Sequence, residues 1–97
     1  MKLYICGPIT NNQNYKEEFS FVADSLLEAG HTVFNPIEME LGEPIFWEEI
    51  MKIDLIEMLQ CDGVAIVHTN QSSKGQALEM LIANQLGIPC QSFENYL

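Results

Sequence analysis

The chain has 97 residues, the size of one domain, because single domains typically run to about 100–150 residues. Hydrophobic residues make up 47% of it and charged residues 19%, a composition typical of a soluble globular domain and not of a disordered or fibrous chain. Fourteen acidic residues against four lysines give a formal net charge of −10, and there is no arginine, so we expect no nucleic acid partner.

The first part of the sequence predicts a strand, a helix and a second strand. The apolar run at residues 3–6 ends at the turn signal Gly7-Pro8, which is typical of a short buried strand. Apolar residues then recur every three or four positions over residues 15–29, and Gly30 marks the end of this helix. Residues 31–34 are predicted to form the second strand.

The remaining sequence predicts two more helix and strand pairs. Residues 36–44 are acidic and aperiodic, and a helix is expected from about residue 45 to 59. A continuous apolar run at residues 64–67 indicates a strand buried on both faces. A third helix is predicted from a serine N-cap at position 72 or 73 to Leu86, followed by a strand at residues 88–90.

This alternation of strands and helices predicts an α/β fold with a single doubly wound parallel sheet of the flavodoxin or Rossmann-like type. Right-handed crossovers place the four strands in the order 2-1-3-4, with three main helices on the two faces. We expect residues 1–97 to form one domain. The carboxyl ends of strands one and three then form the topological switch point, where open α/β sheets bind ligands.

Two segments lie at this switch point: Gly7-Pro8-Ile9-Thr10 and residues 68–75. The start of the third helix combines free backbone N–H groups, hydroxyls and an ammonium group, which favours a phosphate or carboxylate ligand. The residues concerned are Ser72, Ser73, Lys74 and Gly75. In the alternative interpretation a serine only caps the helix and the glycine only permits close packing.

Two carboxylates are candidate catalytic groups. Glu79 shares a helical stripe with Gly75, Ile82 and Leu86, which places it one turn beyond the expected anion site. Asp54 lies between apolar residues of the second helix. Two partly buried carboxyl groups facing one cleft would have their pKa values pushed apart, as acid–base and nucleophilic chemistry requires. Alternatively, each side chain extends from the edge of the core to solvent.

We expect most of the other polar and aromatic residues to have structural roles. We interpret His31 and His68 as residues at element boundaries, and Cys6, Cys61 and Cys90 as buried thiols. The irregular spacing of the acidic residues indicates a solvated surface, so no metal or other cofactor is predicted. Those residues are Glu38, Glu40, Glu43, Glu48 and Glu49. Tyr4 and Trp47 either stack on a base or belong to the core.

Four segments together resemble the nucleoside 2-deoxyribosyltransferase-like superfamily, which includes 2'-deoxynucleoside 5'-monophosphate N-glycosidases and small phage-type relatives of unassigned function. Residues 4–10 (YICGPIT) are similar to its opening strand and glycine turn, and residues 30–36 (GHTVFNP) to its second strand. Residues 73–79 (SKGQALE) resemble its catalytic helix. The middle helix is matched by Trp47, Met51, Asp54, Leu55 and the pair Cys61-Asp62.

The resemblance implies a role for each matching residue. Glu79 would attack the anomeric carbon, Asp54 would assist at the sugar and base, and Tyr4 would orient the glutamate. Ser73 matches a serine that touches phosphate in the monophosphate hydrolases, whereas Pro8 and Thr10 replace a serine and an arginine of their phosphate pocket. The resemblance places the substrate against Gly7, Pro8, Ile9, Thr10, Asn35, Trp47, Ser72, Ser73, Lys74 and Gly75.

The leading hypothesis is therefore an enzyme that hydrolyses or transfers the N-glycosidic bond of a (deoxy)nucleoside 5'-monophosphate or a related small nucleotide. The alternatives are a catalytically silent module that binds a small nucleotide and a purely structural partner protein. We expect a homodimer or larger oligomer, because so small a domain has little surface to exclude water from the site.

We also expect a cytoplasmic protein that does not engage a membrane. No apolar stretch approaches the roughly 18 residues of a membrane helix. Lys2 is followed directly by a short apolar strand, without the hydrophobic segment and cleavage site of a signal peptide.

Overall fold

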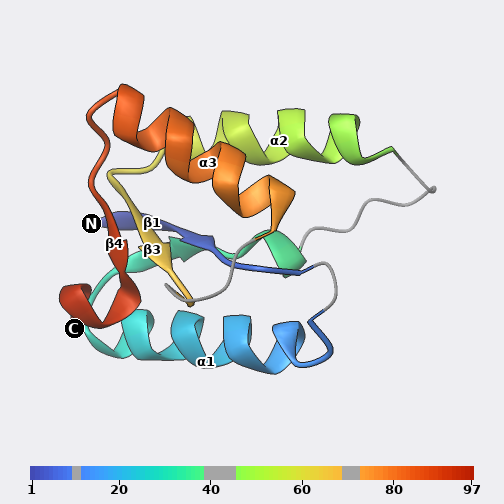
Figure 1. Cartoon of the computed structure of the whole chain (residues 1–97). Helices are drawn as coiled ribbons and strands as arrows, with labels where there is room; N and C mark the ends of the chain where they lie inside the picture. Colours follow the sequence, from blue (N-terminus) through green and yellow to red (C-terminus); the bar gives the residue numbers. More distant parts are fainter. Residues whose placement is uncertain (10–11, 39–45, 69–72) are drawn as a thin grey trace.

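The computed structural model describes residues 1–9, 12–38, 46–68 and 73–97. Strands and helices alternate along the chain, as the sequence predicts, and two short 3₁₀ helices are added (Figure 1). In chain order the elements are β1 (Lys2–Cys6), α1 (Tyr15–Glu28), β2 (Thr32–Phe34), η1 (Pro36–Glu38), α2 (Trp47–Leu59), β3 (Gly63–Ile66), α3 (Lys74–Gln85), β4 (Cys90–Ser92) and η2 (Phe93–Tyr96).

The four strands form one parallel sheet in the order β2-β1-β3-β4, which confirms the predicted fold class. β1 is the central element, because it pairs with β2 on one side and with β3 on the other. Tyr4 of β1 lies beside Phe34 in one register and beside Val64 in the other. Figure 1 shows α1 on one face of the sheet and α2 with α3 on the opposite face.

Alternation along β1 divides the core into two clusters, because successive side chains of a strand point to opposite faces. Leu3 and Ile5 pack with Phe19 and Leu26 on the α1 side of the sheet. Tyr4 and Cys6 belong to the other cluster, which also contains Met58, Val64 and Ala83. β1 therefore presents a phenol and a thiol, both fully buried, to the layer formed by α2 and α3.

Most element boundaries lie within one or two residues of the prediction, and the starts of α2 and β4 differ from it for an identifiable reason. α2 begins at Trp47, because Phe46 has extended backbone angles and precedes the first helical turn as its N-cap residue. β4 begins at Cys90 and not at residue 88, because the N–H of Ile88 still bonds to the carbonyl of Ala83 and closes the end of α3. The 3₁₀ helices η1 and η2 are not signalled by apolar periodicity, since each has only three or four residues.

The buried faces of α2 and α3 are rotated from the faces that apolar periodicity suggests. On α2 the buried residues are Met51, Asp54 and Met58, whereas the Ile53 residue is 36% exposed. On α3 the buried residues are Gln76, Glu79 and Ala83, whereas the expected stripe ended at Leu86, which is 62% exposed. A polar residue therefore occupies a buried position on both helices.

Two further predictions concern the cysteines and membrane-spanning helices. All three cysteines are free thiols; Cys6 and Cys61 are buried as expected, whereas Cys90 is partly exposed and so departs from the prediction. Within the described ranges, no helix is both long and apolar enough to cross a membrane.

Gly7 allows a close approach between the end of β1 and the core. A Cβ atom at this position would lie 2.9 Å from the Cβ of Val67 and 3.1 Å from Cε1 of Phe19. We therefore expect Gly7→Ala to lower the free energy of unfolding by about 1–3 kcal/mol through overpacking. Urea denaturation measures this change.

Gly87 provides the matched control. Its φ is +72° and no heavy atom lies within 4 Å of a Cβ placed there, so Gly87→Asn meets open space with a residue that tolerates left-handed backbone angles. The asparagine variant should differ from the wild type by less than about 0.5–1 kcal/mol. Equal stability of Gly7→Ala and the wild type would show that the end of β1 can shift to accept a methyl group.

Candidate functional site

A cavity of about 270 Å³ opens at the carboxyl end of β1, between the sheet and the first turns of α2 and α3. Its position agrees with the switch point expected for this strand order. Most of its wall is apolar, and its polar groups come from β1, α2 and α3. The lining residues are Tyr4, Ile5, Gly7, Ile9, Phe19, Pro36, Trp47, Ile50, Met51, Asp54, Ser73, Gly75, Gln76 and Glu79.

Glu79 is the most buried carboxylate of the cavity, with 5% of the residue exposed. It lies on the buried face of α3, and two side chains of β1 donate hydrogen bonds to it. The Tyr4 hydroxyl bonds to Oε2, and the Cys6 thiol lies 3.4 Å from Oε1. Each carboxylate oxygen thus has its own donor, which fixes the plane of the carboxyl group.

Both carboxyl groups of the cavity have raised pKa values. Burial raises the pKa of Glu79 to about 7; the hydrogen bond from Tyr4 opposes this shift and the nearby Asp54 adds to it. Burial also raises the pKa of Asp54 to about 6, against the effect of the Tyr4 hydroxyl. Desolvation dominates both shifts, so the two pKa values rise together to near neutral pH and are not pushed apart as the sequence suggested.

Three buried polar atoms have no hydrogen-bond partner among the described residues. They are Oδ1 of Asp54, Oε1 of Gln76 and Nδ2 of Asn35. Gln76 uses its NH₂ group to donate to the carbonyl of His68 at 3.0 Å, so its oxygen is the free end of the amide. Because buried acceptors without a partner are rare, the two on cavity-lining residues are available to donors that enter the cavity, whether water or a ligand.

The start of α3 combines a cap with a cavity wall. Ser73 is the N-cap residue, its Oγ accepts a hydrogen bond from the backbone N–H of Gln76 at 3.3 Å, and its side chain also borders the cavity. Gly75 packs closely, since a Cβ there would lie 3.2 Å from Sδ of Met51. The capping and packing alternative is therefore realised at both residues, and it is compatible with ligand contact.

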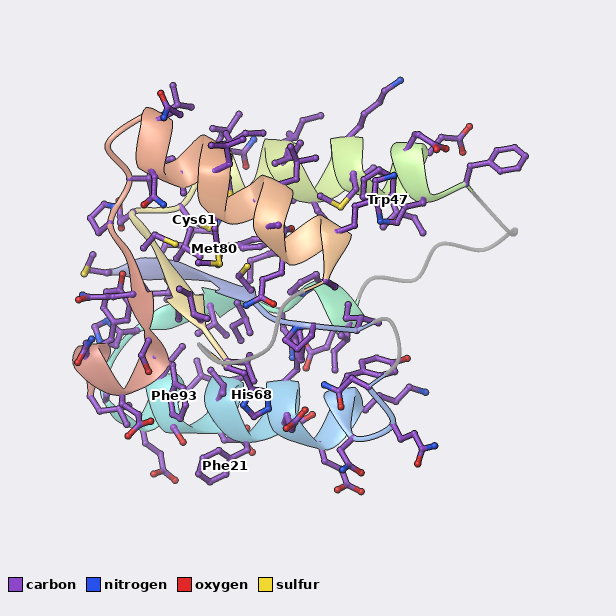
Figure 2. The ribbon with its side chains drawn as sticks, viewed as in Figure 1. Phe21, Trp47, Cys61, His68, Met80 and Phe93 are labelled. Atoms are coloured by element: carbon purple, nitrogen blue, oxygen red, sulfur yellow. The ribbon has the colours of Figure 1, made fainter. Side chains whose placement is uncertain are left out.

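Lys74 and Trp47 contact each other. The Lys74 ammonium lies 4.0 Å from the centroid of the Trp47 ring, a cation–π contact between the first turns of α3 and α2. Trp47, labelled in Figure 2, lines the cavity, so it is not solely a core residue. Lys74 is not one of the described residues that line the cavity.

The remaining predicted site residues divide into three groups. Gly7 and Ile9 line the cavity. Pro8 and Asn35 are buried near it without lining it, and the Pro8 carbonyl accepts a bond from the side chain of Asn12. Thr10 and Ser72 lie outside the described residues.

The histidines are bonded to other parts of the fold. His31 contacts the backbone carbonyl of Tyr96. His68, which is labelled in Figure 2 and lies on the α1 side of the sheet, pairs with Glu18 of α1. Neither lines the cavity, which agrees with their interpretation as boundary residues. In the described part of the chain, no group of three His, Cys, Asp or Glu side chains is arranged to hold a metal ion.

Sequence patterns do not identify two polar residues that surround Glu79. Cys6 is predicted to be a core thiol, although strand alternation places it on the same face as Tyr4. Gln76 carries no motif signal of its own, although it lies three residues before Glu79 and so shares its helical face. Both signals are present in the sequence, but each depends on knowing which face of its element meets the cavity.

Comparison with known proteins gives a family and a similar structure. The family model described as "Domain of unknown function (DUF4406)" matches residues 1–91. No curated protein matches the chain. The fold is similar to that of a 2-deoxyribosyltransferase from the psychrotolerant bacterium Bacillus psychrosaccharolyticus, with 29% identity and a TM-score of 0.74, over 93% of this chain and 69% of that chain.

That enzyme is described as a biocatalyst for the industrial synthesis of antiviral and antitumoral nucleosides. The similarity supports the resemblance to the nucleoside 2-deoxyribosyltransferase-like superfamily, and it does not separate the subgroups within it.

The raised pKa of Glu79 makes stability depend on pH. Its pKa is about 7 in the folded state against 4.5 as the ordinary value, so the native state holds the proton more tightly than the unfolded chain. The resulting stabilisation is fully present below pH 4.5 and is lost as the pH rises to about 7. We expect Glu79→Gln to remove this loss, on the order of 3 kcal/mol, because the amide does not ionise.

Urea denaturation of wild type and Glu79→Gln at pH 5 and pH 8 tests this expectation. The variant should gain stability relative to the wild type at pH 8. Asp54, whose pKa also rises on folding, leaves both proteins with a residual dependence of the same sign. Parallel pH dependence of the two proteins would show that Glu79 titrates normally.

Proposed function

The chain belongs to the DUF4406 family, and we propose that this member hydrolyses or transfers the N-glycosidic bond of a (deoxy)nucleoside 5'-monophosphate or a related small nucleotide. The observation that carries the proposal is the Glu79 carboxylate, buried in the wall of the strand-end cavity and held by the Tyr4 hydroxyl. The similar structure of a 2-deoxyribosyltransferase supports the same class of chemistry.

In the proposed mechanism Glu79 acts as the nucleophile. One oxygen of its carboxylate attacks the anomeric carbon, the bond from that carbon to the base nitrogen breaks, and a glycosyl ester forms through an oxocarbenium-like transition state. Water or a second base then attacks the same carbon, loses a proton to the ionised Asp54 and releases the Glu79 carboxylate. Retaining glycosidases use the same two steps.

In this scheme Asp54 donates a proton to the departing base. The departing base needs a proton, and the pKa values of about 6 and about 7 allow the two carboxyl groups to hold one proton between them near neutral pH. The reactive form carries the proton on Asp54 and the negative charge on Glu79. Because the pKa of Glu79 is the higher of the two, this is the less populated of the two singly protonated forms. The hydrogen bond from the Tyr4 hydroxyl stabilises the charged Glu79 carboxylate in it.

The walls of the cavity suit a nucleoside. Trp47, Ile50 and Met51 provide an apolar surface for the base. The unpartnered oxygens of Asp54 and Gln76 accept hydrogen bonds from ligand donors, such as sugar hydroxyls or base N–H groups. In this proposal Ser73 and the N-terminus of α3 bind the phosphate, because backbone N–H groups and the helix dipole favour an anion there.

A catalytically silent nucleotide-binding module is the second candidate. The same unpartnered acceptors and apolar walls would bind a nucleotide whether or not Glu79 reacts. Release of free base over time separates the two functions. Either function fits a homodimer or larger oligomer, in which a second copy covers apolar groups near the cavity mouth such as Ile9, which is 40% exposed.

Replacement of Glu79 tests the assignment of the nucleophile. Glu79→Gln preserves the shape of the side chain and removes the attacking charge, so turnover should fall by several orders of magnitude while nucleotide binding persists. Base release is followed by chromatography over a panel of nucleosides and nucleoside monophosphates, and affinity is measured by calorimetry.

Glu28→Gln is the matched control, because Glu28 is an exposed glutamate at the end of α1. This variant should turn over like the wild type. Undiminished turnover in Glu79→Gln would refute the mechanism. Tight nucleotide binding by a wild type that releases no base would favour the silent module.

Replacement of Ser73 tests the phosphate contact. Ser73→Ala should weaken binding of a nucleoside monophosphate by about 1–2 kcal/mol, the worth of a hydrogen bond to a charged group, and leave the matching nucleoside unaffected. Calorimetry with both ligands measures the difference. Equal weakening of the two would mean that the hydroxyl serves only as the N-cap of α3.

A further inference from the structure

Cys6 is a buried thiol in contact with the proposed nucleophile. Only 1% of the residue is exposed, and its Sγ lies 3.4 Å from Oε1 of Glu79. The next acceptor, the backbone carbonyl of Gln76, is 4.0 Å away. The carboxylate oxygen is therefore the nearer partner for the thiol proton.

The two donors to Glu79 come from one rigid strand. Tyr4 and Cys6 are two residues apart on β1, so both side chains point to the same face of the sheet. β1 is paired with strands on both sides, and the Cys6 carbonyl accepts a further bond from the N–H of Val67 at 2.8 Å. The spacing of the two donors thus matches the two oxygens of a single carboxylate.

The thiol remains protonated in this environment. Burial raises the pKa of Cys6 far above its ordinary value, and the neighbouring Glu79 raises it further. Cys6 is therefore a hydrogen-bond donor and not a nucleophile, because nucleophilic cysteines have low pKa values and exposed sulfur atoms. It does not line the cavity, so it meets Glu79 from the core side.

We propose that Cys6 is a positioning residue for Glu79: its thiol holds Oε1 while Tyr4 holds Oε2, and the pair fixes the orientation of the carboxylate toward the cavity. The consequence for turnover rests on the function proposed above, whereas the effect on the carboxylate does not. The titratable groups that face Glu79 are Tyr4 and Cys6 of β1, Asp54 of α2 and Cys90 of β4.

The ionisation of Glu79 reports on this contact with a sign that separates it from simple packing. If the thiol donates to the carboxylate, Cys6→Ala removes a bond to the charged form, and the pKa of Glu79 rises. If Cys6 only fills space, the smaller alanine admits water beside the carboxylate, and the pKa falls. Cys6→Ser keeps the shape of the side chain, with a slightly smaller atom, and supplies a stronger donor, so the pKa should fall below the wild-type value.

Cys61→Ala is the matched control. Cys61 is a second buried thiol, and its Sγ contacts the carbonyl of Glu57 at 3.3 Å, an acceptor of α2. Removing it creates a similar loss of volume in the same cluster without removing a donor to Glu79. The titration of Glu79 in this variant should match that of the wild type.

The experiment is a titration of carbon-13-labelled glutamate by NMR in the wild type, Cys6→Ala, Cys6→Ser and Cys61→Ala, with the Glu79 resonance assigned through Glu79→Gln. We expect the acid dissociation constant of Glu79 to fall about threefold in Cys6→Ala, roughly half a pH unit, as a weak donor implies. Because this raises the pKa, the acid limb of the pH profile for base release should move to higher pH.

Three results would overturn the inference: an unchanged Glu79 pKa in Cys6→Ala, a lowered one, or the same shift in Cys61→Ala. If Cys6→Ala does not fold, the serine variant decides, because an unchanged pKa there also contradicts a donor role. The titration needs no substrate. If the Glu79 pKa shifts as expected in the Cys6 variants but the wild type releases no base, the positioning role is upheld and the proposed function is refuted.

Discussion

Glu79 carries a carboxyl group into the layer between the sheet and α3, where burial works against its charge and raises its pKa to about 7. The surrounding structure compensates with donors and not with a cation: the Tyr4 hydroxyl and the Cys6 thiol each bond to one oxygen. Both donors come from β1, so the central strand of the sheet must be held in register for the carboxylate to be held at all.

This dependence explains how the two faces of the sheet differ. On the α1 side, Leu3 and Ile5 pack against apolar residues and supply the hydrophobic stabilisation expected of a small domain. On the other side, buried positions of α2 and α3 are given to Asp54, Gln76 and Glu79, which weakens that half of the core. Polar groups at buried positions are typical of functional sites, where stability is given up for chemistry.

The cavity brings the two buried carboxyl groups and the N-terminus of α3 together in one place. Its floor is the end of β1 and its sides are the first turns of α2 and α3, so a ligand seated there meets Glu79, Asp54 and the capped N-terminus of α3 at once. The Lys74 to Trp47 contact ties the two helices together beside it. A carboxylate with a pKa near neutral, next to a second carboxyl group, is suited to nucleophilic attack coupled to proton transfer.

The sequence by itself determined the order, direction and approximate bounds of the strands and helices, because these follow from local apolar runs, Gly and Pro stops and the handedness of crossovers. It also indicated Glu79 and Asp54, through polar residues interrupting apolar helices. Tertiary structure alone decided that Cys6 and Gln76 join Glu79 and that Lys74 lies on Trp47. The rotation of each helix about its axis is set by packing against the sheet, and a difference of one residue in the buried face changes which side chains meet.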